Sequence, residues 1–154
     1  MKTIKLSNGE LALVDSGDYN MLLKFKWYGS DGYARCNMKK DGKWSSAFMH
    51  RVIMNTPKGG ITDHINRNKL DNRRINLRIC SNSDNLLNSS IRKNNTSGAK
   101  GVRWHKKSKK WVVEVNINYK KKHVGLFKDK IEAIKKYNEV AKKCYGEFAS
   151  PNTI

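Results

Sequence analysis

The middle of the chain, residues 62–88, gathers side chains that can bind a metal ion and move a proton. Asp63 and His64 end the run "GGITDHI", which is typical of a short β-strand, and "INLRI" predicts a second strand after a long polar loop. The run "SNSDNLLN" predicts a helix that carries Asn85 one turn after its start. In that order a carboxylate, an imidazole and an amide oxygen can converge.

Such a set of groups suits the hydrolysis of a phosphodiester. Oxygen ligands favour a hard divalent cation such as Mg²⁺ or Mn²⁺, which keeps waters that exchange with phosphate oxygens. A neutral imidazole, with an ordinary pKa of about 6.5, can accept a proton from water near neutral pH. Four arginines of the loop are expected to contact phosphates. They are Arg67, Arg73, Arg74 and Arg78.

Residues 50–88 resemble the HNH nucleases with the ββα-metal fold, particularly the phage and intron-encoded homing endonucleases. The resemblance implies that His64 is the general base and that Asp63 and Asn85 are the metal ligands. It also implies that Asn76 is the middle Asn, which orients the loop of the general base. The third His of the family name is replaced here by Asn85, a substitution also known in the family.

Two other positions of this segment carry separate expectations. Arg67 stands where relatives usually have Gly, so the loop after the proposed base departs from the family pattern. His50 lies in "FMHRVIM", which we interpret as a strand. We expect it to be a structural or phosphate-contacting histidine and not a metal ligand.

Residues 98–154 predict a small sheet covered by one helix. Short alternating runs indicate strands at 101–105, 110–117 and 121–127, and a helix follows at 129–146 with a capping box at its start and a glycine at its end. One face of the sheet and one stripe of the helix should form the core. The expected core positions are Trp111, Val113, Val115 and Ile117 in the sheet, and Ile131, Ile134, Tyr137, Ala141 and Cys144 in the helix.

This segment resembles the Apetala-type (ethylene-response-factor-like) DNA-binding domain, through "GVRWH", "KWVVEV", "VGLF" and "AIKKYNEVAKKCYGEFASPN". The resemblance implies that the sheet face away from the helix enters a major groove of double-stranded DNA. The family often has Arg at the positions of His105 and Asn116 and Trp at that of His123, so the preferred bases cannot be carried over. The implied DNA face is Arg103, His105, Glu114, Asn116, Lys121 and His123.

Charge and cysteine content limit the class of protein. The 154 residues carry 32 Lys and Arg against 13 Asp and Glu, and this net charge of +19 points to a polyanionic partner. No apolar run is long enough for a membrane span or a signal peptide, so we expect the cytoplasm of a bacterial or phage-infected host cell. Three scattered cysteines indicate buried, reduced thiols, with neither disulfides nor a zinc site.

These observations predict an α+β fold with an N-terminal β-rich segment, a ββα-metal HNH nuclease module and a C-terminal three-stranded antiparallel sheet packed on one helix. The N-terminal segment should hold strands at "ELALVD", "YARCNMK" and "WSSAFMHRVIM" and a short helix capped by Ser16. The expected parts are residues 1–49, the nuclease module at 50–90, an exposed linker at 91–97 and the DNA-binding domain at 98–154.

The leading interpretation is a metal-dependent, site-specific DNA endonuclease of the homing type. One Asp63-His64-Asn85 site and no spare apolar stripe for a dimer interface predict a monomer that nicks one strand. Two alternatives are a DNA-binding regulator with a degenerate nuclease site and a basic RNA-binding accessory protein. The intact set of site residues argues against the first alternative, and the Apetala-like sheet argues against the second.

Overall fold

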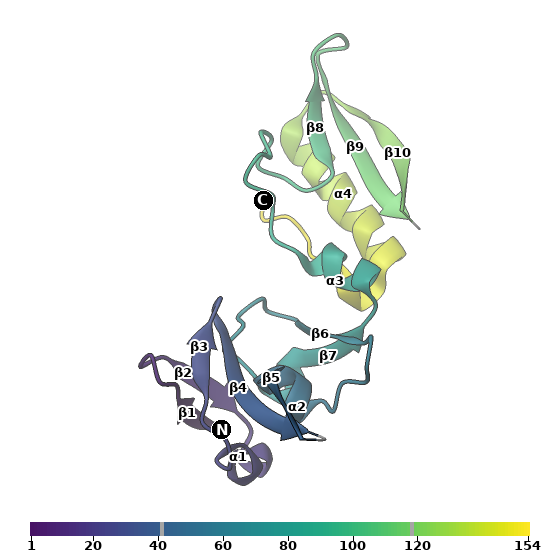
Figure 1. Cartoon of the computed structure of the whole chain (residues 1–154). Helices are drawn as coiled ribbons and strands as arrows, with labels where there is room; N and C mark the ends of the chain where they lie inside the picture. The colour runs from purple at the N-terminus through teal and green to yellow at the C-terminus, as the bar shows by residue number, and fades with distance from the viewer. Residues whose placement is uncertain (41, 118) are drawn as a thin grey trace. The chain divides into compact units, whose positions relative to one another are not determined.

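The chain folds as two compact units, residues 1–81 and 82–154, each described here by itself (Figure 1). Helices and small antiparallel sheets occur in both units, so the expected α+β class is confirmed. This division differs from the four expected parts. The computed structural model describes residues 1–40, 42–117 and 119–154.

The first unit is built from short antiparallel sheets and two short helices. Within its described residues β1 pairs with β2, β4 lies between β3 and β5, and β6 pairs with β7. An Asp-Gly turn joins β3 to β4, with Asp31 and Gly32 both at positive φ, as a two-residue hairpin turn requires. The elements are β1 (Lys2–Lys5), β2 (Leu11–Val14), α1 (Ser16–Leu22), β3 (Tyr28–Ser30), β4 (Tyr33–Lys40), β5 (Lys43–Phe48), α2 (Met49–Ile53), β6 (Ile61–His64), the 3₁₀ turn η1 (Arg74–Asn76) and β7 (Leu77–Cys80).

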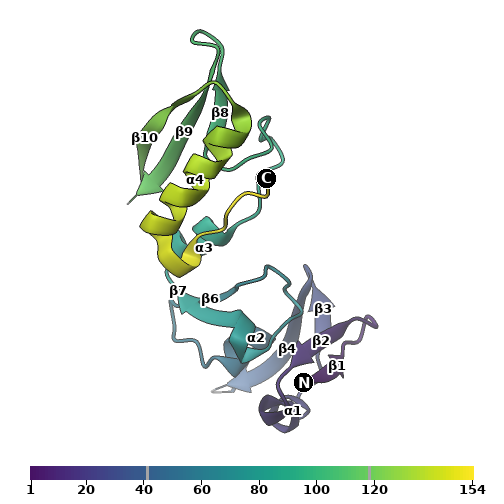
Figure 2. The same cartoon turned by 180° about the vertical axis from the view of Figure 1, so that it is seen from behind.

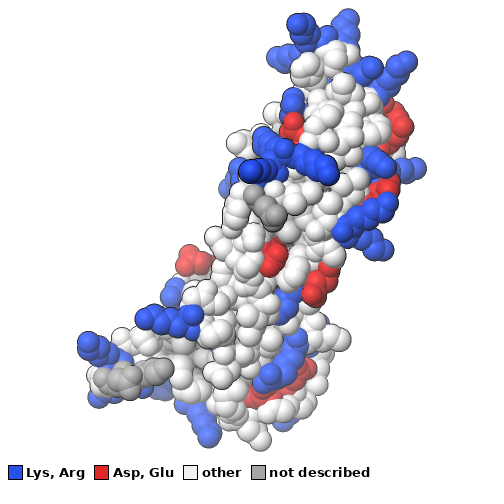
Figure 3. All heavy atoms as spheres, turned by 90° about the vertical axis from the view of Figure 1, so that its right-hand side faces the viewer, with Lys and Arg blue, Asp and Glu red and all other residues white. Residues whose placement is uncertain are grey.

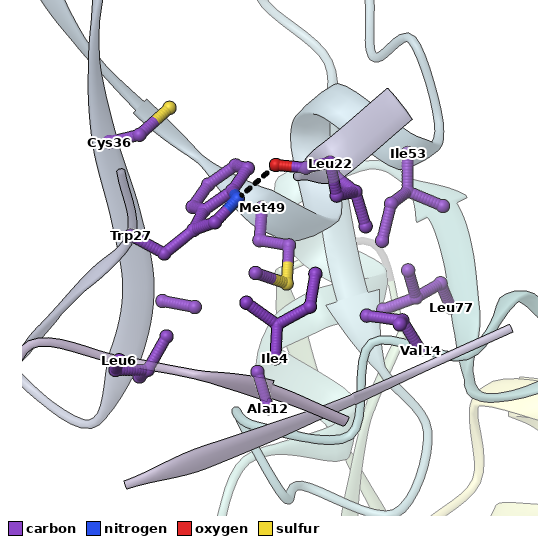
Figure 4. Close-up of a cluster of buried hydrophobic side chains, with 11 residues drawn as sticks. Ile4, Leu6, Ala12, Val14, Leu22, Trp27, Cys36, Met49, Ile53 and Leu77 are labelled. Carbon is purple, nitrogen blue, oxygen red and sulfur yellow. Dashed lines mark hydrogen bonds between the residues drawn. The ribbon is translucent and has the colours of Figure 1, made fainter. Parts of the chain in front are cut away.

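A single apolar core joins both ends of the first unit (Figure 4). Trp27 is part of this core and donates a hydrogen bond from Nε1 to the carbonyl oxygen of Leu22 at 2.8 Å. Residues before and after position 49 therefore contribute to one core. The buried cluster comprises Ile4, Leu6, Ala12, Val14, Leu22, Trp27, Ala34, Cys36, Met49, Ile53 and Leu77.

Two local predictions in the first unit are wrong. The strand expected through "FMHRVIM" ends at Phe48, and α2 follows it. Met49 and Ile53 are both buried, and their spacing of four residues puts them on one face of a helix. The short helix α1 forms as expected, but its N-cap residue is Asp15, and Ser16 is the first helical residue.

The second unit holds a three-stranded antiparallel sheet with one long helix against one of its faces (Figures 1 and 2). The order across the sheet is β10-β9-β8, and the β9 bounds agree with the expected 110–117. The register of β10 against β9 shifts between His123 and Gly125, so the pairing of these two strands is irregular at that point. The elements are α3 (Asn82–Asn88), β8 (Val102–His105), β9 (Lys110–Ile117), β10 (Lys120–Phe127), α4 (Lys130–Tyr145) and the 3₁₀ turn η2 (Gly146–Phe148).

The capping signals of α4 are confirmed. The Asp129 side chain accepts a hydrogen bond from the backbone N–H of Glu132 at 2.8 Å, and Gly146 ends the helix at φ 55°. The expected apolar stripe is only partly right. Ile131, at the edge of the stripe, is half-exposed, and Cys144, in the last turn, is exposed. The buried positions of α4 are Ala133, Ile134, Tyr137 and Ala141.

Among the described residues no disulfide joins the cysteines, and only Cys36 is buried. Cys80 is half-buried and Cys144 is exposed, so the expectation of three buried thiols is wrong. Burial raises the pKa of the Cys36 thiol, which keeps it protonated and unreactive at neutral pH.

The segment before β8 is anchored to the second unit by its last residues. Ser97 and Ala99 are buried, and the Ser97 hydroxyl donates to the Ala99 carbonyl oxygen at 3.0 Å. The Asn152 side chain accepts from the Lys100 N–H at 2.7 Å and donates to the Lys100 carbonyl oxygen at 3.1 Å. The end of the expected exposed linker is thus part of a folded unit.

Candidate active site

The β6–β7 hairpin positions the candidate acid–base and ligand residues. The expected strands are confirmed at Ile61–His64 and Leu77–Cys80. Their antiparallel register places Asp63 opposite Arg78 and His64 opposite Leu77. The Asp63 and His64 side chains are both buried, so the strand end holds two polar groups in a protected environment.

Asp63 is paired with Arg78 across the hairpin. The carboxylate Oδ2 accepts from Arg78 Nε at 3.0 Å and from Nη2 at 2.8 Å. The two side chains are 8% and 10% exposed, so the pair is shielded from salt and water. Arg78, expected among the phosphate contacts, thus contacts Asp63 here, and its role at a phosphate stays a prediction.

Asn76 bridges the two ends of the loop between the strands. Its Oδ1 accepts from the Asn66 N–H at 2.9 Å, and its Nδ2 donates to the Asp71 carbonyl oxygen at 2.7 Å. The Asn76 carbonyl oxygen also accepts from the Ile65 N–H at 2.9 Å. These bonds hold the residues just after His64, and the orienting role of Asn76 stays a prediction.

The other loop arginines differ in their contacts. Arg73 donates to both carboxylate oxygens of Asp71, at 2.7 and 2.6 Å, and its guanidinium lowers the pKa of that carboxyl group. Arg74 donates to both oxygens of Asp18, at 2.8 and 2.7 Å. Arg67 is exposed at the loop, with a backbone φ of 64°.

Replacing Arg67 by glycine should stabilise the first unit by about 0.5–1 kcal/mol. The left-handed conformation costs a non-glycine residue roughly 1–2 kcal/mol, part of which is offset by the greater entropy of glycine in the unfolded chain. Urea unfolding followed by the amide NMR signals of β6 and β7 measures the change. Arg67→Ala is the matched control, because it removes the same charge but keeps the strained Cβ, and it should give no gain. Equal gains in both variants would attribute the effect to charge.

The surroundings of His64 favour the neutral form of its imidazole. Its ring is buried, and Nε2 lies 3.3 Å from Oδ1 of Asn72. Burial lowers the pKa of His64, while the Asn72 contact and the Asp63 charge act in the opposite direction. An uncharged ring is the form that can accept a proton.

Two aromatic rings pack against His64. The His50 ring lies edge-on at 4.9 Å between centroids, and the Tyr33 ring lies at 6.1 Å. His50 is itself buried and stacks on Phe48 at 5.2 Å, and burial lowers its pKa to about 3. This placement supports the structural alternative for His50. Its contact with His64 was not predicted, because the two residues are separated by a turn and a helix.

Asn85 lies on α3 and is half-buried there. That helix belongs to the second unit, whereas Asp63, His64 and Asn76 belong to the first, so the joint ligand set stays a prediction. The donor chemistry fits a hard divalent ion, because a carboxylate and an amide both offer oxygen atoms. Within the described residues no group of three or more His, Cys, Asp or Glu side chains is arranged to hold a metal ion.

The six residues of the implied DNA face lie on the β8–β10 sheet. Lys121 is opposite Asn116, and His123 is opposite Glu114, so these four share one face by strand alternation. Glu114 pairs with Arg103 at 3.2 Å, which lowers the pKa of the carboxyl group. Basic side chains are spread over both units on the face drawn in Figure 3. Arg103, Asn116, Lys121 and His123 are exposed, and His105 and Glu114 are half-exposed.

Comparison with known proteins gives a match over nearly the whole chain. The "Uncharacterized HNH endonuclease L560" of Acanthamoeba polyphaga mimivirus is 33% identical over 153 residues, which cover 95% of this chain and 76% of that protein. The chain belongs to the HNH endonuclease family. "Protein 3.8" of Escherichia phage T7 is 33% identical to this HNH chain over 93 residues, 60% of the chain and 76% of that protein. No family model and no solved structure matches.

The family assignment confirms the HNH resemblance, while the Apetala resemblance stays a prediction. Among the described residues of this HNH chain, no helix is long and apolar enough to cross a membrane.

Proposed function

We propose that the protein is a divalent-metal-dependent, site-specific DNA endonuclease of the homing type that nicks one strand. The observation that carries the proposal is a buried His64, whose pKa burial lowers, beside Asp63 at the end of β6, in a chain of the HNH family. A buried neutral imidazole is suited to act as a general base.

In the proposed reaction His64 takes a proton from the attacking water. Asn76 keeps the residues after His64 in place through its two side-chain hydrogen bonds. Asp63 and Asn85 would hold Mg²⁺ or Mn²⁺. When bound, such an ion stabilises the negative charge that develops on the phosphate and on the departing 3′ oxygen.

The β8–β10 sheet is proposed to place the nuclease on double-stranded DNA. Its face opposite α4 offers Arg103, Lys121 and His123 as exposed donors for phosphates and bases. The net charge of +19 provides the long-range attraction, so affinity should fall steeply as salt rises. One asymmetric chain on DNA has one site, which suits a monomer that cuts one strand.

The direct test is the cutting of supercoiled plasmid that carries the target. With Mg²⁺ the supercoiled form should convert first to open circle, and a chelator should abolish cutting until Mg²⁺ or Mn²⁺ is restored in excess. Linear DNA as the first product would contradict nicking. DNA binding without any cutting in either metal would favour the alternative of a DNA-binding regulator.

Charge reversal at Arg103 tests whether DNA binds to the sheet face that carries Arg103 or to another part of the basic surface. Arg103→Glu should weaken binding to duplex DNA by at least about tenfold, because it removes a donor and adds repulsion at the phosphates. Lys142→Glu is the control, since Lys142 is an exposed residue in the last turn of α4. It changes the net charge equally and should have a much smaller effect in gel-shift titrations. Equal losses would place the DNA elsewhere.

A further inference from the structure

Asn72 is a fully buried polar residue in direct contact with the proposed base. Its exposed fraction is 0%, although it lies in a loop rich in polar residues. The Asn72 N–H donates to the Leu13 carbonyl oxygen at 2.8 Å, and the Leu13 N–H donates to the Leu70 carbonyl oxygen at 2.8 Å. Both bonds fix the loop to β2, so the Asn72 side chain is held rigidly against His64.

The hydrogen bonding of the Asn72 amide is one-sided. Oδ1 lies 3.3 Å from His64 Nε2, whereas Nδ2 has no hydrogen-bond partner among the described residues. A buried N–H group without a partner costs about 1–3 kcal/mol. An asparagine kept only for stability would be expected to satisfy both ends of its amide. The contact with His64 therefore explains why an asparagine is buried at position 72.

We propose that Asn72 is a positioning residue that holds the proton of neutral His64 on Nε2, so that Nδ1 is the basic nitrogen. This inference rests on the proposed role of His64 as general base. The Asn72 oxygen accepts the Nε2–H, and the neutral ring then carries its lone pair on Nδ1. A base whose tautomer is set in advance has the lone pair on the correct nitrogen before DNA binds.

The oxygen of Asn72 is the atom that suits this position throughout the reaction. When His64 takes a proton from water it becomes an imidazolium, which has an N–H on both nitrogens. Oδ1 accepts the Nε2–H in both states, while an amide turned to place Nδ2 there would repel the imidazolium. The rings of His50 and Tyr33 pack against the same imidazole and oppose its turning over.

The test is the tautomer of His64 in the full chain, read from long-range ¹H–¹⁵N correlation spectra. The chain has four histidines, so single His→Gln variants assign the signals. Wild-type His64 should show the Nε2–H pattern in the absence of metal. Asn72→Leu, which keeps the volume but removes the acceptor, should give a mixture of tautomers. Asn72→Asp, which keeps an acceptor oxygen, should retain the Nε2–H form.

Cutting assays complete the test. Asn72→Leu should lower kcat by about two- to tenfold without changing DNA affinity, because the rate falls with the fraction of His64 that carries its lone pair on Nδ1. Asn68→Leu is the control, because Asn68 lies in the same loop and its Oδ1 accepts a hydrogen bond from the Leu70 N–H at 3.1 Å. Loss of this bond should leave the tautomer of His64 unchanged.

Three outcomes decide between the explanations. An Nδ1–H form of His64 in the wild-type protein overturns the proposal without any substitution. A loss of kcat in Asn72→Leu with an unchanged tautomer also overturns it and leaves a structural role. If His64→Ala cuts DNA normally, the proposed function fails, while the tautomer measurement still tests the contact itself.

Discussion

Replacing His64 by alanine is expected to lower the rate of DNA cutting by about a hundredfold to ten-thousandfold, the usual cost of losing a general base. The substitution removes the only proposed proton acceptor at the end of β6. DNA affinity should not change, because His64 is buried and the proposed DNA contacts lie on other residues. Single-turnover cutting at saturating protein, measured beside a gel-shift titration, separates the two quantities.

His123→Ala is the matched control for this experiment. It also removes one imidazole, but from the exposed face of the β8–β10 sheet. We expect it to weaken DNA binding and to leave the single-turnover rate nearly unchanged at saturation. Near-normal cutting by His64→Ala would remove His64 from its role, whatever the outcome for His123.

The second large effect is expected in the second unit, where Gly101→Ala should cost about 3–5 kcal/mol of unfolding free energy. A Cβ at Gly101 would lie 2.1 Å from a ring carbon of Tyr137 and 2.4 Å from the Glu114 carbonyl oxygen. Neither neighbour can easily give way: Tyr137 is buried in the core, and the Glu114 N–H donates to the Gly101 carbonyl oxygen at 2.8 Å. Overpacking and the left-handed backbone, with φ at 64°, both contribute.

Urea unfolding followed by the amide signals of β9 measures this cost. Gly98→Ala is the control, because Gly98 also has a positive φ, 70°, but no heavy atom lies within 4 Å of an added Cβ. It should cost only about 1–2 kcal/mol. Similar losses in the two variants would mean that backbone strain, and not the contact with Tyr137, determines the effect. The Gly101 variant should also lose DNA affinity, since its sheet carries the proposed interface.

Local signals in the sequence predicted much of the fold. A short alternating run identified β9, the run that ends in Asp63 and His64 identified β6, and a capping box with a terminal glycine identified α4. Each of these patterns reports interactions between residues a few positions apart, which the order of residues contains directly. The same patterns mark the proposed site residues, because Asp63 and His64 end a strand.

Interactions between distant segments could not be predicted in this way. The core shared by β1, β2, α2 and β7 depends on how separate elements pack, and no period within one segment encodes it. The pairing of Asp63 with Arg78 depends on the register of two strands joined by a twelve-residue loop, residues 65–76. Asn72 was not singled out, since one Asn among many in a loop carries no signal for burial or for contact with His64.

The two separate hydrophobic cores bear on how such a chain can be recombined. Among the residues that the structure describes, the buried core of the first unit ends at Leu77, and that of the second begins at Ala99. An exchange of the proposed DNA-binding modules between relatives would leave both clusters of buried apolar residues intact at any junction between them. With a junction at 81/82, where the units divide, residue 85 would come from the incoming module and not from the nuclease parent. A junction after Asn88 keeps the proposed ligand with Asp63 and His64, so we expect functional chimaeras to retain α3 from the nuclease parent.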